Sequence, residues 1–278
     1  MKIVIDQIQY RYPNGVTALA DVSLRVAAGE QVAIVGQNGS GKTTLAKHLN
    51  GLLRPSAGQV YIGDWRTDEH SVAQLARRVG YLFQHPDEQL FQRTVAAELA
   101  FGPRNLGFDV TRTTTLVTEA LHSLELTAVA QENPYDLSLA WRKRVALAAV
   151  LAMDTPILVL DEPTTGQDAR FQALLGRLLV QWRQAGKTVI AISHDMEFVA
   201  ANFTRLVVMH AGRVLRTGLT AEVVGETAVL QQTQVEPPAI TRLAQGLNLP
   251  NTVWTVPDFL AAWRGNGREP KFDEQHDK

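Results

Sequence analysis

A glycine-rich segment at residues 36–43 limits the possible folds of this chain more than any other feature of its sequence. It reads Gly-Gln-Asn-Gly-Ser-Gly-Lys-Thr, follows an apolar run at 31–35 and precedes a stretch with helical spacing at 42–53. Glycines allow successive backbone N–H groups to turn inward around a phosphate chain, and the N-terminus of the following helix adds its dipole. The segment therefore predicts a phosphate-binding loop between a buried strand and a helix.

Two side chains at the end of this segment have the chemistry that a chain of phosphates requires. Lys42 supplies a positive charge for the β- and γ-phosphates, and the hydroxyl of Thr43 is a ligand that Mg²⁺ accepts. The alternative is a glycine-rich turn with a purely structural role. The strand and helix expected on either side of the segment argue against it.

Short apolar runs alternate with longer helical segments along much of the chain. The runs at 79–83, 157–160 and 188–192 are typical of buried strands, whereas the segments at 142–153 and 171–184 have helical spacing. This alternation predicts an α/β fold with a parallel sheet.

The regions outside this pattern suggest the domain organisation. Residues 2–27 alternate in character and contain turn signals, which predicts an N-terminal antiparallel β layer. We expect a main domain at 1–220 with a helical insertion at about 87–150, a small C-terminal helical extension at 221–265, and a disordered tail at 266–278. Two short helices of the extension are expected at 239–246 and 255–263.

The composition excludes several classes of protein. Among the 278 residues, 27 Lys and Arg nearly balance 28 Asp and Glu, so no overall basic field attracts nucleic acid, and we expect no nucleic-acid partner. Without cysteine there is no disulfide and no thiolate chemistry. The longest apolar run, at 145–153, is too short to span a membrane, and the N-terminus lacks the features of a signal peptide. We therefore expect the chain to remain in the cytoplasm.

A pair of acidic residues follows the apolar run at 157–160. Acids at the carboxyl end of a buried parallel strand lie where α/β proteins bind their ligands. Asp161 is expected to hold Mg²⁺ through water, and Glu162 to polarise an attacking water. An acidic pair can also be an ordinary strand exit, but the phosphate-binding loop favours the functional interpretation.

Four motifs in this order resemble those of the ATP-binding-cassette (ABC) ATPases. They are the loop at 36–43, Gln84, the sequence Asp-Glu-Pro at 161–163 and the sequence Ser-His-Asp at 193–195. The resemblance covers about residues 2–218 and implies a P-loop NTPase core of the ABC ATPase type, with the antiparallel β layer, the helical insertion and the C-terminal helical extension.

The resemblance assigns a role to each motif. Glu162 is similar to the catalytic glutamate, His194 to the switch histidine that contacts the γ-phosphate, and Gln84 to the glutamine that joins the Mg²⁺ site to the interface with a membrane partner. Tyr12 resembles the aromatic residue that stacks on adenine. The residues expected to bind ATP are Tyr12, Gly36, Gln37, Asn38, Gly39, Ser40, Gly41, Lys42, Thr43, Thr44 and Ser138, and those expected to hold Mg²⁺ are Thr43, Gln84 and Asp161.

One motif departs from the family. Its signature Leu-Ser-Gly-Gly-Gln corresponds here to Leu-Ser-Leu-Ala-Trp at 137–141. Ser138 retains the hydroxyl, whereas Leu139 and Ala140 add Cβ atoms that disfavour positive φ. Because the family's signature acts on the nucleotide of the other subunit, a homodimer of this chain has two altered sites. We therefore favour a heterodimer with a second ABC ATPase subunit whose signature is intact.

The region around Gln84 resembles one branch of the family, the energy-coupling factor (ECF) and cobalt-type ATPases. The sequence Gln-His-Pro-Asp-Glu-Gln-Leu-Phe at 84–91, Thr-Val at 94–95 and Ala-Phe-Gly-Pro at 100–103 carry this resemblance. It implies an ATPase at the cytoplasmic face of the membrane that powers import of a vitamin or metal ion. The implied partners are a transmembrane coupling protein, held in a groove at 84–102, and a small membrane substrate-binding protein.

Three other functions remain open at this point. The chain could serve another ABC transporter class, such as an importer supplied by a soluble binding protein. It could be a soluble ABC ATPase of DNA repair or ribosomes, although such relatives commonly have two cassettes or long insertions. The altered signature also allows an assembly subunit with little turnover of its own.

Overall fold

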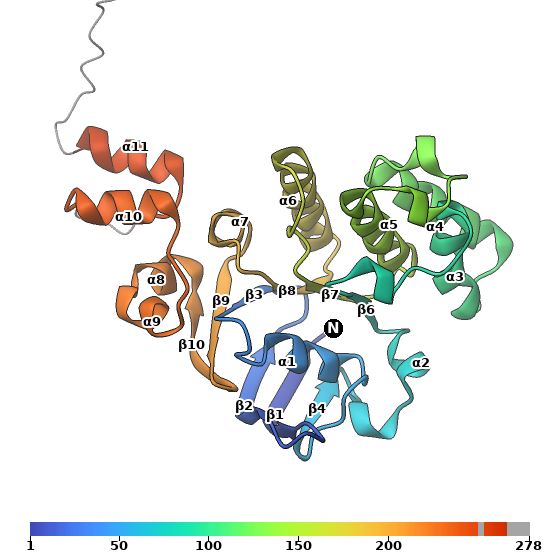
Figure 1. Ribbon diagram of the computed structural model, residues 1–278, viewed down its shortest axis with the longest axis horizontal. Coiled ribbons are helices and arrows are strands. Elements are labelled where there is room, and N and C mark those ends of the chain that lie inside the picture. The colour runs from blue at the N-terminus through green and yellow to red at the C-terminus, as the bar shows by residue number, and fades with distance from the viewer. Residues whose placement is uncertain (250–252, 266–278) are drawn as a thin grey trace, which may run out of the picture.

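The strands of the computed structural model, which describes residues 1–249 and 253–265, form two sheets (Figure 1). The first sheet is antiparallel, with four strands in the order β2-β1-β4-β5. In the second, ordered β10-β9-β3-β8-β7-β6, all strands are parallel except β10. The strands are β1 (Ile3–Arg11), β2 (Thr17–Val26), β3 (Gln31–Val35), β4 (Ala57–Ile62), β5 (Trp65–Arg66), β6 (Val79–Leu82), β7 (Ile157–Asp161), β8 (Thr188–Ile192), β9 (Arg205–His210) and β10 (Arg213–Leu219).

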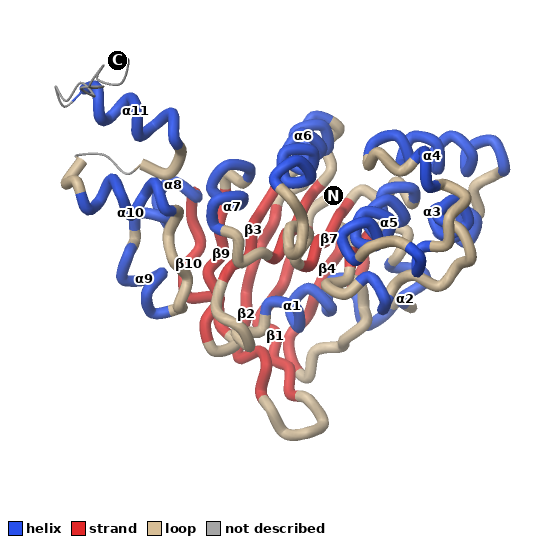
Figure 2. Tube along the Cα trace, turned by 45° about the horizontal axis from the view of Figure 1, so that its top comes forward, coloured by secondary structure: helices blue, strands red, loops and turns tan. Residues whose placement is uncertain are grey.

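Helices cover both faces of the six-stranded sheet and extend beyond its two ends. The antiparallel sheet and α1 lie on one face, and α5, α6 and α7 lie on the other (Figures 1 and 2). Helices α3 and α4 lie beyond α5 at one end, and α8 to α11 lie beside β10 at the other. The helices are α1 (Lys42–Leu49), α2 (Val72–Leu75), α3 (Val95–Asn105), α4 (Val110–Ser123), α5 (Leu139–Ala152), α6 (Ala169–Gln184), α7 (Met196–Asn202), α8 (Thr220–Gly225), α9 (Thr227–Gln232), α10 (Ala239–Gly246) and α11 (Val256–Gly265), with 3₁₀ turns at 67–69, 86–88, 127–129 and 134–136.

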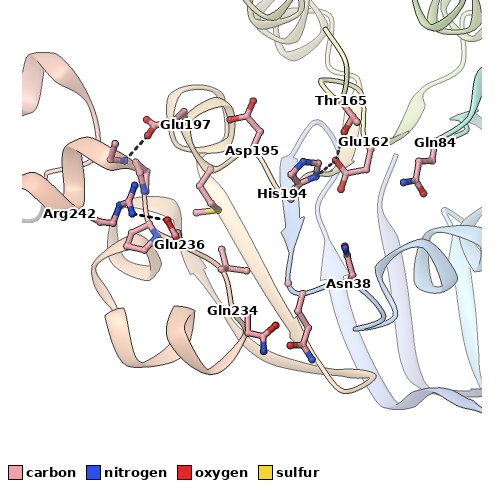
Figure 3. Close-up of a pocket in the computed structure, with 17 residues that line it drawn as sticks. Asn38, Gln84, Glu162, Thr165, His194, Asp195, Glu197, Gln234, Glu236 and Arg242 are labelled. Carbon is pink, nitrogen blue, oxygen red and sulfur yellow. Dashed lines mark hydrogen bonds and ion pairs between the residues drawn. The ribbon is translucent and has the colours of Figure 1, made fainter. Parts of the chain in front are cut away.

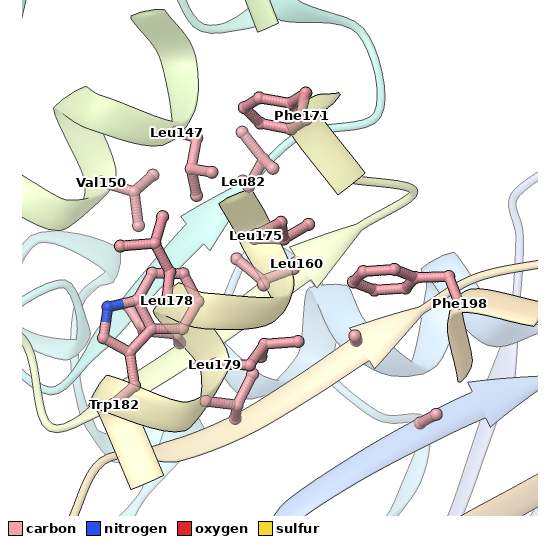
Figure 4. Packing of buried hydrophobic residues seen from close by; sticks show 14 of the residues in the cluster. Leu82, Leu147, Val150, Leu160, Phe171, Leu175, Leu178, Leu179, Trp182 and Phe198 are labelled. Atoms are coloured by element: carbon pink, nitrogen blue, oxygen red, sulfur yellow. The ribbon is translucent and has the colours of Figure 1, made fainter. Parts of the chain in front are cut away.

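Strand β3 shows why the core has two halves. All five of its residues are buried, and successive side chains point to opposite faces of a strand. Val32 and Ile34 join the cluster formed with α1 and the antiparallel sheet, whereas Ala33 and Val35 join the cluster under α5, α6 and α7. Figure 4 shows the second cluster, in which Phe171, Leu175 and Trp182 of α6 pack over the sheet. This burial on both faces explains the continuous apolar runs of the parallel strands.

The predicted fold class is confirmed, and some element boundaries differ from the prediction. Helix α1 ends at Leu49 rather than at residue 53, because Gly51 has a φ of 75° and leaves the helical region. Helix α5 begins at Leu139, before the expected residue 142, because the Ser138 side chain accepts a hydrogen bond from the Trp141 N–H and starts the helix.

The domain boundaries at 220 and 265 stay predictions, and the expected tail at 266–278 lies outside the described residues. Both predicted helices of the extension are present, as α10 and α11. Among the helices described, none is both long enough and apolar enough to cross a bilayer.

Candidate active site

The phosphate-binding loop connects β3 to α1 and is held between the two sheets. A Cβ at Gly36, whose φ is 149°, would lie 2.2 Å from the carbonyl oxygen of Met209 in β9. A Cβ at Gly41, whose φ is 100°, would lie 2.6 Å from the carbonyl oxygen of Ala18 in β2. Both positions therefore require glycine, for the backbone angle and for space.

Lys42 folds back into this loop. Its Nζ donates hydrogen bonds to the carbonyl oxygens of Gly36 and Gln37, at 2.7 and 2.9 Å. The residue is 7% exposed, and this burial lowers the pKa of its amine, whereas Glu162 and Asp161 act in the opposite direction. The loop thus holds a buried cation beside the backbone N–H groups that would surround a phosphate.

Asp161 ends β7 and accepts hydrogen bonds from two hydroxyls. Thr43 Oγ1 donates to Oδ1 at 3.3 Å, and the Tyr81 hydroxyl donates to Oδ2 at 3.2 Å. Burial raises the pKa of Asp161, and the two hydrogen bonds oppose this shift.

The pair of Thr43 and Asp161 fits Mg²⁺. Hydroxyl and carboxylate oxygens are the ligands that this ion prefers, and it usually takes the remaining ones from phosphates and water. The described part of the chain contains no cluster of three or more His, Cys, Asp or Glu that could hold a metal by itself. Gln84, the third predicted ligand, lines the same cavity as Thr43.

Glu162 and His194 meet at the ends of neighbouring strands. His194 Nδ1 lies 2.8 Å from Glu162 Oε2, and the Thr165 hydroxyl donates to the same oxygen at 3.1 Å (Figure 3). The Glu162 side chain is 9% exposed and that of His194 is 64% exposed. Strands β7 and β8 are paired, so their carboxyl ends deliver these residues to one edge of the sheet.

Two cavities bring the predicted residues together. One of about 440 Å³ is lined by Tyr12, the loop, Gln84 and Glu162. The other, of about 710 Å³, is lined by Gln84, Glu162, His194 and part of the C-terminal extension (Figure 3). Tyr12 reaches the first turn of α1 directly after the loop, because its hydroxyl lies 3.0 Å from Thr44 Oγ1.

Ser138, one of the predicted ATP-binding residues, lies away from the phosphate-binding loop. It stands at the N-terminus of α5 and lines neither of these two cavities. The next residue, Leu139, is 51% exposed. A surface position is compatible with the expectation that this segment serves the nucleotide of another subunit.

Three side chains at the site were not predicted from the sequence. Tyr81 and Thr165 bind the two carboxylates, and Lys143 donates to the backbone of the turn after β7. Tyr81 lies within an apolar strand, and nothing in the strand's pattern indicates that its hydroxyl reaches Asp161. Lys143 lies beside the altered signature, where its burial could not be recognised.

Comparison with known proteins identifies the family. A family model described as ABC transporter matches residues 19–165, more than half of the chain. The chain belongs to this family. The ABC fold class and the ABC ATPase assignment predicted from the motifs are thereby confirmed, and binding of ATP follows from membership.

Several relatives in the ABC family are named as ATP-binding proteins of transporters, and one of them as a cobalt import protein. The chain is 41% identical to the cobalt import ATP-binding protein CbiO of Rhodobacter capsulatus, over 87% of each protein. It is 36% identical to the energy-coupling factor transporter ATP-binding protein EcfA of Methanothermobacter thermautotrophicus, over 89% of this chain and 80% of that protein. It also matches a putative ABC transporter ATP-binding protein of Methanosarcina acetivorans at 39% identity, but spans only 44% of that relative's length.

Solved structures of ABC proteins have the same fold. CbiO1 of Clostridium perfringens, described as part of the ABC transporter complex cbiONQ, superposes with a TM-score of 0.73 at 31% identity, over 88% of this chain and 98% of CbiO1. The ATP-binding cassette MJ0796, solved as a dimer bound to ADP and Pi, superposes with a TM-score of 0.70 at 26% identity, over 78% of this chain and 98% of that one.

Proposed function

We propose that this chain is the ATP-hydrolysing subunit of an ECF-type importer for a vitamin or a metal ion. The observation that supports hydrolysis most strongly is the contact between Glu162 and His194 beside the phosphate-binding loop. In this proposal Tyr12 stacks on adenine, and the loop and Lys42 hold the phosphates. Thr43, Asp161 and Gln84 hold Mg²⁺, which neutralises phosphate charge when bound.

Glu162 would polarise the attacking water, and His194 would contact the γ-phosphate. The contact of His194 with the Glu162 carboxylate is made by Nδ1, which leaves Nε2 for the γ-phosphate, so both roles are compatible with one position of the ring. Two ATP molecules between two subunits would close the dimer and move the membrane partner, and hydrolysis would reset it.

This assignment predicts separate effects for two variants. Glu162→Gln should preserve ATP affinity and lower kcat by about 10²-fold or more, because the general base is lost. Lys42→Ala should weaken ATP binding itself, because the cation beside the phosphates is gone. Equilibrium binding of a fluorescent ATP analogue and steady-state ATPase rates check both. Equal kcat in Glu162→Gln and wild type would contradict the role of Glu162.

An apolar groove supports the proposed membrane partner. A cavity of about 240 Å³ beside α3 is lined mainly by apolar side chains, among them Leu52, Val72, Phe91 and Phe101. Phe91 is 56% exposed and Phe101 is 43% exposed, and their rings meet edge to face. The buried Glu98 carboxylate fixes this wall by accepting hydrogen bonds from the N–H groups of Phe91 and Gln92. We propose that helices of the transmembrane coupling protein bind here, which places the chain peripherally at the cytoplasmic face of the membrane.

Capture of the tagged chain from its native membranes in mild detergent tests the assembly. Mass spectrometry should find a second ABC ATPase, a coupling protein and a small membrane substrate-binding protein. Phe91→Asp should lose the membrane proteins, because it places a charge in the groove. Val110→Asp is the matched control, since Val110 is 83% exposed on α4 and does not line the groove. Recovery of the chain only as a homodimer, or with ribosomes or DNA, would overturn the transport role.

A further inference from the structure

Lys143 is a buried cation to which the proposed function gives no role. It is 8% exposed, and burial lowers the pKa of its amine, opposed by Glu162 and Asp161. Its Nζ donates to the backbone carbonyl oxygens of Thr165, at 2.8 Å, and of Glu162, at 3.3 Å. Burying an ammonium group is costly unless its hydrogen bonds are satisfied, so these two carbonyls account for its position.

The two carbonyls belong to the turn that carries the proposed general base. Glu162 has a φ of 53°, in the left-handed region that residues with a side chain disfavour. The Glu162 N–H donates to the carbonyl oxygen of Ile192 at 2.9 Å, and the Thr165 hydroxyl donates to the Glu162 carboxylate. Lys143 thus holds both ends of a turn whose backbone is strained and whose shape sets the direction of the carboxylate.

A second hydrogen bond ties the same region to α5. Gln167 Nε2 donates to the carbonyl oxygen of Ala140 at 3.1 Å. Helix α5, which begins at the altered signature, therefore contacts the segment 162–167 through two side chains, Lys143 of the helix and Gln167 of the segment. A shift of this helix would be transmitted to Glu162 through Lys143.

We propose that Lys143 is a positioning residue, which holds the turn at 162–165 and thereby directs the Glu162 carboxylate toward the water that attacks ATP. The proposal rests on the proposed role of Glu162 in hydrolysis. Lys143 itself touches no reacting atom.

Three variants test this role. Lys143→Met removes the donors and keeps an unbranched side chain, and Lys143→Arg restores a cation with several N–H donors. Lys187→Met is the matched control, because the Lys187 Nζ also makes two hydrogen bonds, to Asp154 and to the Thr155 carbonyl, but away from the site.

Two measurements separate positioning from general stability. Hydrogen–deuterium exchange of the nucleotide-free chain should rise at 161–168 in Lys143→Met, and stay at the wild-type level there in Lys187→Met. Steady-state kinetics should show kcat lowered by about tenfold in Lys143→Met, the scale expected for losing charged hydrogen bonds, with KM and ATP affinity unchanged. Lys143→Arg should recover most of the lost kcat.

Other outcomes overturn the inference or the function separately. Unchanged exchange at 161–168 in Lys143→Met, or an unchanged kcat in this variant, overturns the role of Lys143. The proposed function still stands in that case if the wild-type chain hydrolyses ATP. A wild-type chain that binds ATP without hydrolysing it, also with its captured partners, overturns the proposed function and the directing role together. The exchange data still decide whether Lys143 holds the turn.

Discussion

At the scale of single residues, Asp161 shows how distant parts of the chain hold one carboxylate. Thr43 belongs to the loop before α1, and Tyr81 belongs to the neighbouring strand β6. Burial and the negative charge of Asp161 raise the pKa of the Tyr81 phenol well above its ordinary value, so it stays protonated and donates. Each oxygen of Asp161 is thereby fixed from a different side.

Tyr81→Phe should therefore loosen the proposed Mg²⁺ site without a change of fold. Loss of one hydrogen bond of about 1 kcal/mol corresponds to about a fivefold higher Mg²⁺ concentration for half-maximal ATP binding. Titration of Mg²⁺ against a fluorescent ATP analogue measures this. Tyr61→Phe is a suitable control, because the Tyr61 hydroxyl donates to Gln59 on the antiparallel sheet. An unchanged Mg²⁺ requirement in Tyr81→Phe would exclude this positioning role.

Asp161 also gives a prediction about pH. The pKa of Asp161 is raised in the folded chain, so its carboxyl ionises at a lower pH in the unfolded chain than in the folded one. Folding stability therefore falls as pH rises from about 4 through the raised pKa. Asp161→Asn lacks this penalty. At pH 7 it should therefore melt at a higher temperature than the wild type without nucleotide. The difference should shrink toward pH 4, and a constant difference across this range would contradict the explanation.

At the scale of elements, the sequence predicts the strands that are buried on both faces and the loop between them. Strands such as β3 and β8 appear as continuous apolar runs, and their carboxyl ends are followed by the residues that form the site. The contact of Tyr81 with Asp161 could not be predicted in this way, because it depends on which strand lies beside β7. The contact of Lys143 with the turn depends likewise on the packing of α5 against the sheet.

A local signal explains the error at the start of α5, and a long-range strand pairing explains the error in the extent of the antiparallel layer. Helix α5 begins earlier than its apolar spacing suggests, because the Ser138 side chain caps its N-terminus. The first three residues of the helix are those of the altered signature. The antiparallel layer also continues past residue 27, with β4 paired to β1. This pairing joins segments separated by the whole loop and α1, so periodicity within one window does not reveal it.

At the scale of the whole molecule, the altered signature has consequences for assembly. Leu139, Ala140 and Trp141 face a nucleotide of the other subunit in the proposed dimer, so the chain alone should hydrolyse ATP slowly and without cooperativity.

Changing Leu139, Ala140 and Trp141 together to Gly, Gly and Gln should let the Glu162→Gln variant form an ATP-dependent homodimer, measured by size-exclusion chromatography with light scattering. The wild-type signature in the same background should stay monomeric. Its full dimerisation with ATP would contradict the preference for a heterodimer.

The position of the phosphate-binding loop between two sheets has a further consequence for the sequences that this fold can accept. Gly36 and Gly41 are limited by backbone atoms of β9 and β2, whereas a Cβ at Gly39, whose φ is 78°, meets nothing within 4 Å. Asparagine, which tolerates positive φ, is therefore acceptable at 39 and not at the other two positions. Substitution at 36 or 41 would become possible only together with a displacement of a strand in one sheet or the other, so the evolution of this loop is linked to that of both sheets.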